Sequence, residues 1–422
     1  MKAIYTLLFH LALPLILLRL LWRGIKAPAY FHRWPERFGK VAAMPASQPI
    51  IWVHAVSVGE VEATRPLISG LRASYPEHRI LITTMTPTGS ERVKKLYTGE
   101  VDHCYLPYDL PFAIRRFLKA KHPEFGIIME TELWPNLVDQ CHQLHIPLVL
   151  ANARLSARSA KGYQRFSKLT AQMLKQFCFI AAQTQEDQQR FRALGAEYAD
   201  VHATGNLKFE ISLPASATEQ AEAIRSMWGN RPVWIAASTH EGEEELVLNA
   251  SRKVRAEFPD LLLLLVPRHP ERFDRAAALS RKAGFKTLRR SEGKPCGRDI
   301  EVLVIDTMGE LPTFYATCDV ALIGGSLIPH GGHNLLEPAA LGRPVLTGPH
   351  FFNFNEITKQ FLDSGAAMLV RDSHEIAQTM IMLLSNAEQR ASMGQTAMAQ
   401  IQRNQGASMR LLNLIKRHIK QA

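Results

Sequence analysis

The feature that most constrains this chain is a succession of short, continuous apolar runs separated by stretches with helical spacing. Such runs are typical of parallel strands that are buried on both faces between layers of helices. The runs form two series along the sequence. The first series is IIWVHAVS (50–57), RILITTMT (79–86), FGIIMET (125–131), IPLVLANA (146–153), CFIAAQT (178–184) and VHATG (201–205), and the second is VWIAAST (233–239), LLLLLVP (261–267), EVLVIDT (301–307), VALIGGS (320–326) and PVLTGP (344–349).

Two series of buried strands predict two doubly wound α/β domains. A length of 422 residues suits two or three domains at ~100–200 residues each. The weakly patterned LPASATEQ marks the break at about 206–222. We therefore expect one Rossmann-like domain over 25–210 and a second over 211–422. Ligands of open α/β sheets bind at the carboxyl ends of the strands, and two such domains facing each other would form a cleft.

An apolar stretch, AIYTLLFHLALPLILLRLLW, occupies residues 3–22. A membrane-spanning helix needs ~20 mostly apolar residues, so we expect an uncleaved anchor over 1–24. The alternative is an interfacial helix that lies flat on the membrane. The excess of basic residues follows the stretch rather than precedes it, which predicts that the rest of the chain stays on the cytoplasmic side.

The net charge of +11, with a pI near 9.5, would ordinarily suggest nucleic-acid binding. Residues 1–40, however, hold seven basic side chains and one acidic side chain, which is +6 of the +11. The charge therefore points to an anionic membrane and away from nucleic acid. The five cysteines are widely spaced and include no CxxC pair, so neither a zinc site nor a disulfide framework is predicted.

Polar residues follow several first-series strands. Glu60 lies in the segment His54-Ala-Val-Ser57-Val-Gly59-Glu60, directly after the first strand. It is either a general base or an acid that complements the dipole of the next helix. Glu130-Thr-Glu132-Leu-Trp-Pro places two carboxylates together. Glu132 suits a helix N-cap, which leaves Glu130 for chemistry. Lys208, in GNLKFE, is either a surface lysine or a cation that neutralises a leaving phosphate.

A basic stripe is predicted downstream of the fourth strand of the first series. Within NARLSARSAKGYQRFSK (152–168), the spacings of three, four and three would put four basic side chains on one face of a helix. The stripe is either a solvated face or a surface for anionic lipid headgroups or a phosphorylated substrate. Its residues are Arg158, Lys161, Arg165 and Lys168.

The second domain carries three loops suited to an anionic ligand. Arg268 and His269 follow the most apolar strand, and Met308-Gly309-Glu310 follows the next. The third loop, GGSLIPHGGHNLLEP (324–338), delivers the chain to a helix N-terminus, where a phosphate can bind. Asn334 and Glu337 also fit a capping box. The loop is neither a P-loop nor a GxGxxG fingerprint, and no Asp-x-Asp indicates a bridging metal.

Several motifs in one order resemble the 3-deoxy-D-manno-octulosonic acid (Kdo) transferases of lipid A assembly. These motifs are SVGE (57–60), ETELWPN (130–136), NARLSARS (152–159), TGNLKFE (204–210), PRHPERF (267–273) and GGSLIPHGGHNLLEPAALGRPVLTGP (324–349). The resemblance implies a GT-B glycosyltransferase that transfers Kdo from CMP-Kdo to lipid IVA with inversion. It also implies a single-pass anchor in the cell inner membrane, catalytic domains on the cytoplasmic side, and no cofactor.

The resemblance also assigns roles to residues. It implies that Glu60 is the base and that Glu130 and Lys208 stabilise the transition state. The CMP-binding set that it implies is Arg268, His269, Met308, Gly309, Glu310, Asn334, Leu335, Leu336 and Glu337. The number of Kdo residues added depends on the shape of the acceptor site, and two successive transfers are one option.

Two other classes of function remain open from the sequence. Another membrane-associated GT-B enzyme that uses a UDP-sugar would share the two domains and the region of Glu337, without needing a CMP pocket. A membrane-anchored binding protein would tolerate the loss of both Glu60 and Glu130. The gathering of polar residues at the strand ends argues against the binding protein.

Overall fold

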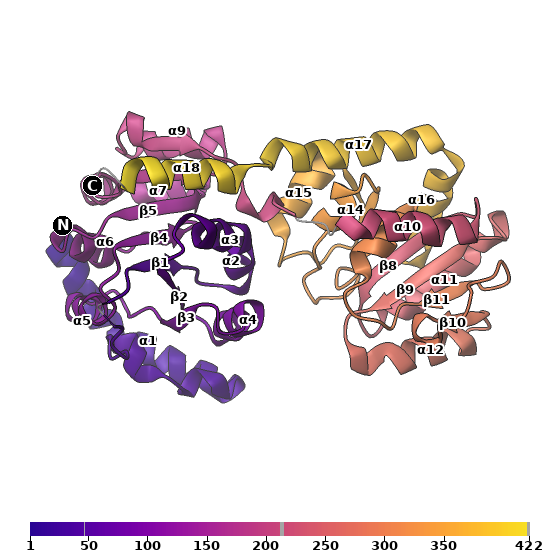
Figure 1. Cartoon of the computed structure of the whole chain (residues 1–422), viewed down its shortest axis with the longest axis horizontal. Coiled ribbons are helices and arrows are strands. Elements are labelled where there is room, and N and C mark those ends of the chain that lie inside the picture. The colour runs from indigo at the N-terminus through magenta and orange to yellow at the C-terminus, as the bar shows by residue number, and fades with distance from the viewer. Residues whose placement is uncertain (46, 212–214, 420–422) are drawn as a thin grey trace. The chain divides into compact units, whose positions relative to one another are not determined.

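A computed structural model describes residues 1–45, 47–211 and 215–419. Its internal contacts divide the chain into two units (Figure 1). The first unit contains Met1–Glu210 together with the chain from Asn404 onward, and the second contains Ile211–Arg403. Each unit is built on a seven-stranded sheet in which the paired strands are parallel, so the prediction of two doubly wound domains is confirmed.

The sheet of the first unit has the strand order β3-β2-β1-β4-β5-β6-β7. Six of these strands lie within predicted runs. Five of the six, all except β7, are almost wholly buried, which explains their continuous apolar sequences. The edge strand β3, with the sequence DHCY, was not predicted because it is only half apolar. The strands are β1 (Ile50–His54), β2 (Arg79–Thr84), β3 (Asp102–Tyr105), β4 (Phe125–Met129), β5 (Leu148–Ala153), β6 (Phe179–Ala182) and β7 (Val201–Ala203).

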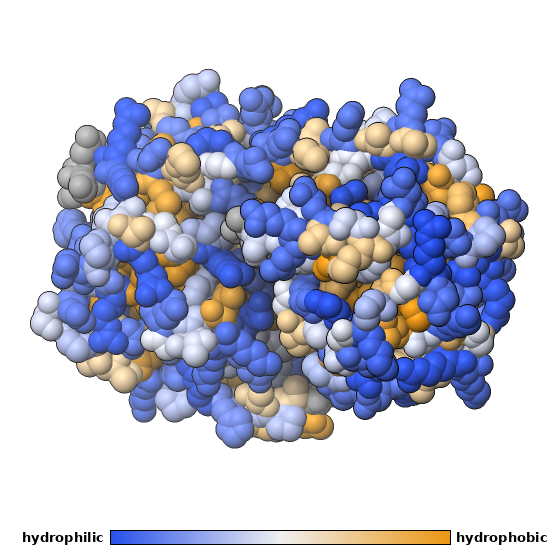
Figure 2. All heavy atoms as spheres, turned by 45° about the vertical axis from the view of Figure 1, so that its right-hand side comes forward, coloured by the Kyte–Doolittle hydropathy of each residue, from blue (hydrophilic) through white to orange (hydrophobic). Residues whose placement is uncertain are grey.

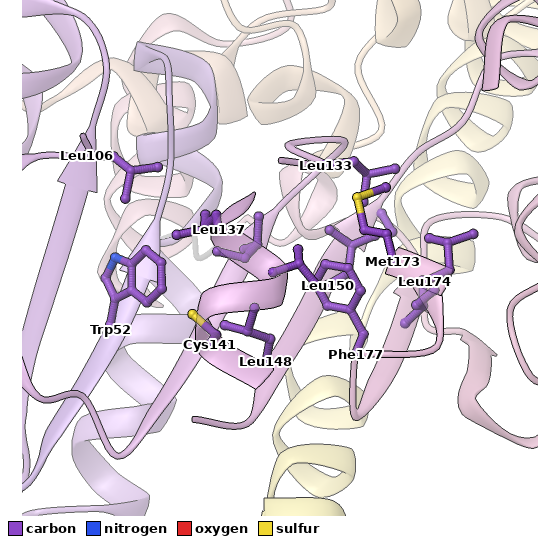
Figure 3. Packing of buried hydrophobic residues seen from close by; sticks show 14 of the residues in the cluster. Trp52, Leu106, Leu133, Leu137, Cys141, Leu148, Leu150, Met173, Leu174 and Phe177 are labelled. Carbon is purple, nitrogen blue, oxygen red and sulfur yellow. The ribbon is translucent and has the colours of Figure 1, made fainter. Parts of the chain in front are cut away.

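Alternate residues of these strands pack into two cores on opposite faces of the sheet. Trp52 and Leu150 belong to one core, and Val53 and Val149 belong to the other. Figure 3 shows side chains of α6 and α8 meeting those of β5 in the first of these cores. The helices of this part are α2 (Val58–Ala63), α3 (Arg65–Ser74), α4 (Pro87–Tyr97), α5 (Pro111–Lys121), α6 (Pro135–Gln143), α7 (Ala157–Gln164), α8 (Ser167–Leu174) and α9 (Gln185–Ala193), with 3-10 turns η3 (Tyr198–Asp200) and η4 (Leu207–Phe209).

The apolar N-terminal stretch forms one helix, α1 (Lys2–Lys26), followed by the turns η1 (Pro28–Phe31) and η2 (Trp34–Phe38). Its length and composition are sufficient to cross a membrane. One face packs on the first unit, where Phe9 and Leu13 contact a cluster around Leu110. The remaining face is apolar and exposed. Its large side chains are Ile4, Leu7, Leu8, Leu11, Leu15, Leu18, Leu21, Trp22 and Ile25.

Polar contacts fix the first two turns of α1. The Lys2 ammonium lies 2.6 Å from a carboxylate oxygen of Asp139, and the Thr6 hydroxyl donates to the Asn136 Oδ1 at 2.8 Å. Both partners belong to α6. The N-terminal end of α1 is therefore held against the globular part of the first unit.

The second unit has the strand order β10-β11-β9-β8-β12-β13-β14, and its core is lined by Trp234, Leu263 and Leu322 among others. The short strands β10 and β14 lie at the two edges and were not predicted. The strands are β8 (Val233–Thr239), β9 (Leu262–Pro267), β10 (Thr287–Arg289), β11 (Val302–Val304), β12 (Val320–Ile323), β13 (Val345–Thr347) and β14 (Ala367–Leu369). The helical segments are α10 (Ala215–Trp228), α11 (Glu243–Glu257), η5 (Pro270–Arg272), α12 (Phe273–Lys282), η6 (Arg290–Glu292), α13 (Leu311–Thr317), α14 (Leu336–Ala340), α15 (Asn355–Asp363), α16 (Ser373–Ser385) and α17 (Ala387–Asn404).

The last helix, α18 (Ala407–Ile419), returns to the first unit. Its residues Ala407, Leu411 and Ile415 are buried in the core that also contains Leu67 and Ile68 of α3. This differs from the expected boundary, which assigned the whole of 211–422 to the second domain. The reason is physical: the apolar face of α18 is covered by α3, and that contact is invisible in a linear sequence.

In the view of Figure 2, hydrophilic residues cover most of the visible surface, and hydrophobic residues show between them. This is the ordinary surface of a globular protein.

Candidate functional site

Glu60 lies on the short helix α2, directly after β1. Ser57 is the N-cap of this helix, and its hydroxyl donates to the Glu60 Oε1 at 2.9 Å. The backbone N–H of Val56 donates to the Glu60 Oε2 at 2.8 Å. The Glu60 carboxylate therefore satisfies donors at the start of α2, a structural role more specific than the helix-dipole alternative drawn from the sequence.

The same carboxylate has an unusual electrostatic environment. Glu60 is 8% exposed. This burial, and next the negative charge of Glu130, raises the pKa of Glu60 from 4.5 to about 7. A carboxylate with a pKa near 7 can take a proton at neutral pH and release it again, which is what a general base requires.

Glu130 follows β4 in a strained conformation. Its φ is +58°, which is uncommon for a residue with a side chain, and its N–H donates to the Ala151 carbonyl of β5 at 2.9 Å. One carboxylate oxygen lies 2.6 Å from the Lys208 ammonium of η4. The structure therefore brings Glu60, Glu130 and Lys208 together within the first unit: Glu130 pairs with Lys208, and its charge acts on Glu60.

Asn152 supports this group and was not singled out from the sequence. It lies in β5 with a φ of +51°, where the register between β5 and β6 shifts. Its side-chain Oδ1 accepts the N–H of Leu207 at 2.9 Å, which fixes the turn that carries Lys208. Its Nδ2 is buried and has no hydrogen-bond partner among the residues that the structure describes. The sequence did contain a feature that could have drawn attention to Asn152: an amide side chain in an otherwise apolar strand, at the start of the NARLSARS motif.

Glu132 does not cap α6, contrary to the alternative drawn from the sequence. Its carboxylate accepts the indole N–H of Trp134 at 2.8 Å, and Trp134 is itself the N-cap residue. The cap is supplied by Asp109, which accepts the backbone N–H groups of Asn136 at 3.0 Å and Leu137 at 2.8 Å. A capping side chain that comes from another loop cannot be recognised by local spacing.

The predicted basic stripe is divided between two helices. Arg158 and Lys161 lie on α7, Arg165 is its C-cap, and Lys168 lies on α8. The single helix expected from the spacing is wrong because the chain turns at Phe166. All four basic side chains are exposed, and within 1–45, 47–211 and 215–419 none of them forms an ion pair. We refer to them as the basic cluster.

In the second unit, the residues assigned to CMP binding follow β9, β11 and β12. Arg268 and His269 are exposed after β9, and the Arg268 N–H donates to the Thr239 carbonyl at 3.0 Å. Met308 is exposed after β11, and Gly309 has a φ of +89°, which favours glycine. Glu310 pairs with Arg290 at 2.8 Å, and this cation is the first cause that lowers the pKa of Glu310.

A buried acidic side chain, Glu243, holds the glycine-rich loop after β12 in place. The carboxylate of Glu243, at the start of α11, accepts the backbone N–H groups of Gly325, Ser326 and Leu327 at 2.7–3.1 Å. Gly324 is packed so closely on β8 that a Cβ would lie 2.5 Å from the Ser238 carbonyl oxygen. The loop is therefore held in one conformation by contacts that require glycine and a carboxylate.

The end of this loop differs in detail from the capping box. Helix α14 begins at Leu336, and its N-cap is Leu335. Asn334 instead accepts the N–H of Leu336 at 3.1 Å and donates to the Glu337 carboxylate at 3.3 Å. Leu335 and Leu336 are buried. In the described part of the chain, no three His, Cys, Asp or Glu side chains are arranged to hold a metal ion.

Two family models match the chain. Residues 32–211 match the model described as "3-Deoxy-D-manno-octulosonic-acid transferase (kdotransferase)", and residues 230–400 match "Glycosyl transferases group 1". A 3-deoxy-D-manno-octulosonic acid transferase of Haemophilus influenzae is 42% identical, with 98% of each chain covered. One of Bordetella pertussis is 37% identical over 98% of this chain and 99% of that protein. A solved glycosyltransferase of Rickettsia africae is 13% identical, with a TM-score of 0.52 over 89% of this chain and 100% of that one.

Proposed function

The chain belongs to the 3-deoxy-D-manno-octulosonic acid transferase family, and on that premise we propose that it transfers Kdo from CMP-Kdo to lipid IVA. It is a glycosyltransferase enzyme, and its two parallel sheets have the GT-B fold. The proposed reaction inverts the anomeric carbon and uses neither a metal nor a cofactor. The family supports the sugar that is transferred, and the arrangement of charges supports the mechanism below.

In the proposed mechanism Glu60 is the general base. The acceptor hydroxyl attacks the anomeric carbon of Kdo and gives its proton to the Glu60 carboxylate. A new carbon–oxygen bond forms, and the bond between that carbon and the CMP phosphate breaks, with its electron pair leaving on the phosphate. The observation that supports this role most directly is the pKa of Glu60, which burial raises to about 7.

Glu130 and Lys208 stabilise the transition state in this proposal. Lys208 supplies a cation for the negative charge that develops on the leaving phosphate, and Glu130 orients that cation through their 2.6 Å contact. The strained backbone at Glu130 is consistent with a functional position, because strain of this kind gathers at active sites.

The donor nucleotide is proposed to bind in the second unit. Arg268 offers a guanidinium to the single phosphate of CMP, and His269 adds a donor beside it. Gly309 lets the backbone approach the ligand, and Glu337 and Asn334 hold the loop end through their hydrogen bond. The full proposed set is Arg268, His269, Met308, Gly309, Glu310, Asn334, Leu335, Leu336 and Glu337.

Replacing Glu60 tests the proposed function. With CMP-Kdo and lipid IVA as substrates, we expect Glu60→Gln to slow transfer by ~10²–10⁴-fold, because a general base contributes about that much. CMP binding should persist, since Glu60 lies outside the proposed nucleotide set. Mass spectrometry of the product measures transfer, and calorimetry measures CMP binding.

The matched control is Glu62→Gln, an exposed acid on the same helix that pairs with Arg92. It should leave the rate unchanged. Near-normal turnover by Glu60→Gln would contradict the assignment of Glu60 as the general base. A wild-type protein that binds UDP in preference to CMP would instead support the alternative, a UDP-sugar enzyme of the same fold.

We also propose that α1 attaches the enzyme to the cell inner membrane, with both units on the cytoplasmic side. The exposed apolar face of α1 and the exposed basic cluster both belong to the first unit. Lys2 and Leu169 of α8 line one shallow recess, so the start of α1 lies beside the helix that carries Lys168. An exposed apolar face and exposed basic side chains on one unit are suited to an anionic bilayer.

The contacts of α1 favour the flat placement over the spanning one. If the 24-residue span Lys2–Ile25 of α1 crossed the ~30 Å hydrocarbon core, it would carry its first turn to the far side of the membrane. The contacts of Lys2 with Asp139 and of Thr6 with Asn136 would then be lost. A flat helix keeps them and still buries Leu11, Leu15 and Leu18 in lipid.

A further inference from the structure

Four histidines gather in the second unit, and only His269 has been given a role. His240 follows β8, His269 follows β9, and His330 and His333 lie in the glycine-rich loop after β12. The ring of His240 stacks on His330 at 4.3 Å and on His333 at 5.1 Å between centroids. It also meets His269 edge-on at 5.5 Å. We refer to His240, His330 and His333 as the histidine cluster.

The charges that surround the cluster are predominantly positive. The positive charges of Arg268 and Arg272 both lower the pKa of His240. Arg272, however, is paired with Glu244 at 3.0 Å and with Glu241 at 3.4 Å. The nearby Glu243 carboxylate accepts the His240 backbone N–H at 2.9 Å, in addition to its bonds with the glycine-rich loop. The carboxylates close to the cluster are thus occupied by other partners, whereas Arg268 has no ion-pair partner within 1–45, 47–211 and 215–419.

The two inner rings of the cluster share a hydrogen bond that limits their protons. The Nε2 atoms of His240 and His333 lie 2.8 Å apart, so one must carry a hydrogen and the other must accept it. Neither Nδ1 atom has a hydrogen-bond partner among the described residues. When the pair holds one extra proton, both Nδ1 atoms carry hydrogens, and the pair offers two donors to a ligand.

We propose that the histidine cluster and Arg268 form a binding site for an oxyanion of the donor, namely the carboxylate of Kdo. This inference rests on the proposed function. Kdo is a sugar acid whose carboxylate is attached to the anomeric carbon, the same atom that bears the phosphate of CMP-Kdo. A carboxylate site must therefore adjoin the phosphate site, and Arg268 and His269, proposed for the phosphate, adjoin the cluster.

Proton uptake is an expected consequence of this site. Burial lowers the pKa values of His240 and His333 to about 4, and the neighbouring cations add to this effect. Both rings are therefore neutral at pH 7 in the free protein. An anion beside them opposes these effects and raises the pKa values, so a proton enters the pair as the ligand binds.

The full-length enzyme with His333→Gln tests the site, and His374→Gln, an exposed histidine of the same unit, is the control. For His333→Gln we expect the KM for CMP-Kdo to rise at least about tenfold, as the loss of one charge-assisted hydrogen bond would cause, with the Kd for CMP within about twofold of wild type. Calorimetry with CMP-Kdo and no acceptor, in two buffers of different ionisation enthalpy, should show proton uptake that the variant loses.

The outcomes separate the possible ligands. If His333→Gln weakens CMP as much as CMP-Kdo, the site binds an oxyanion but its source is the phosphate. If neither the KM for CMP-Kdo nor the Kd for CMP changes in His333→Gln, the proposal is overturned. Should His333→Gln fail to fold, the exposed His330→Ala gives the same reading. A wild-type enzyme that neither binds CMP nor consumes CMP-Kdo would contradict the proposed function itself.

Discussion

At the residue scale, Glu60 is held by the fold and is also the side chain that we propose for the chemistry. Its carboxylate accepts a backbone N–H and the Ser57 hydroxyl, yet burial and Glu130 keep its pKa near 7. The hydrogen bonds favour the ionised form, and burial favours the protonated form. Burial is the larger effect, and it leaves a carboxylate that titrates close to neutrality.

The pH dependence of the rate should report this pKa. A base acts when it is ionised, so kcat/KM should rise with pH through a midpoint of about 7. Glu130→Gln removes a neighbouring negative charge, so the remaining activity should have its midpoint at lower pH. Burial still holds the pKa above the ordinary 4.5. Rates measured across the pH range would contradict the assignment if wild type and Glu130→Gln had the same midpoint. The control, Glu62→Gln, should leave the midpoint unchanged.

Asn152 gives a second test at this scale. Asn152→Gly keeps a residue that accepts a positive φ, whereas Asn152→Ala does not, so the alanine variant should lose about 1–2 kcal/mol more unfolding free energy. Both variants remove the acceptor for the Leu207 N–H and should lower kcat, because Lys208 loses its support. Denaturant titration and steady-state kinetics measure the two effects. Equal stability of the two variants would show that the backbone conformation is not strained.

At the scale of elements, the basic cluster depends on where α7 ends. The spacing of Arg158, Lys161, Arg165 and Lys168 predicts one helical face, but the turn at Phe166 divides the cluster between α7 and α8. The cluster stays on the surface of one unit, because all four side chains are exposed. The proposal of an anionic-lipid surface therefore does not depend on the four residues sharing one helix.

Neutralising the basic cluster should weaken contact with anionic lipid. Four Lys/Arg→Gln changes should reduce binding to anionic vesicles by about 1 kcal/mol per side chain, or raise the KM for lipid IVA. CMP binding should stay unchanged. The control is Lys94→Gln with Lys95→Gln, an exposed basic pair on α4. If neither vesicle flotation nor acceptor KM responds, the cluster is an ordinary solvated surface.

At the scale of the whole molecule, the proposed flat placement of α1 on the membrane can be tested by labelling. A cysteine in place of the exposed Ala3 reports the side on which the helix begins. We expect a membrane-impermeant thiol reagent to reach it in inside-out vesicles and not in right-side-out ones, because a flat α1 keeps its first turn against α6. Labelling in right-side-out vesicles only would show a spanning helix. Ala157→Cys, exposed on α7, is the control for the side on which we propose that both units lie.

The sequence by itself determined the two parallel sheets, because strands buried on both faces must be continuously apolar. It also pointed to Glu60, Glu130, Lys208, Arg268 and the glycine-rich loop as candidates, since ligands of open α/β sheets bind at the carboxyl ends of the strands. Edge strands such as β3, with the mixed sequence DHCY, carry no such signal.

Only the tertiary structure decided which of these residues meet. The 2.6 Å pair of Glu130 and Lys208, the support from Asn152 and the histidine cluster join residues from separate strands and loops. The return of α18 to the first unit joins segments more than 300 residues apart, from Leu67 to Leu411. Local spacing specifies which face of an element is apolar, whereas the partner that covers it is chosen by packing across the whole chain.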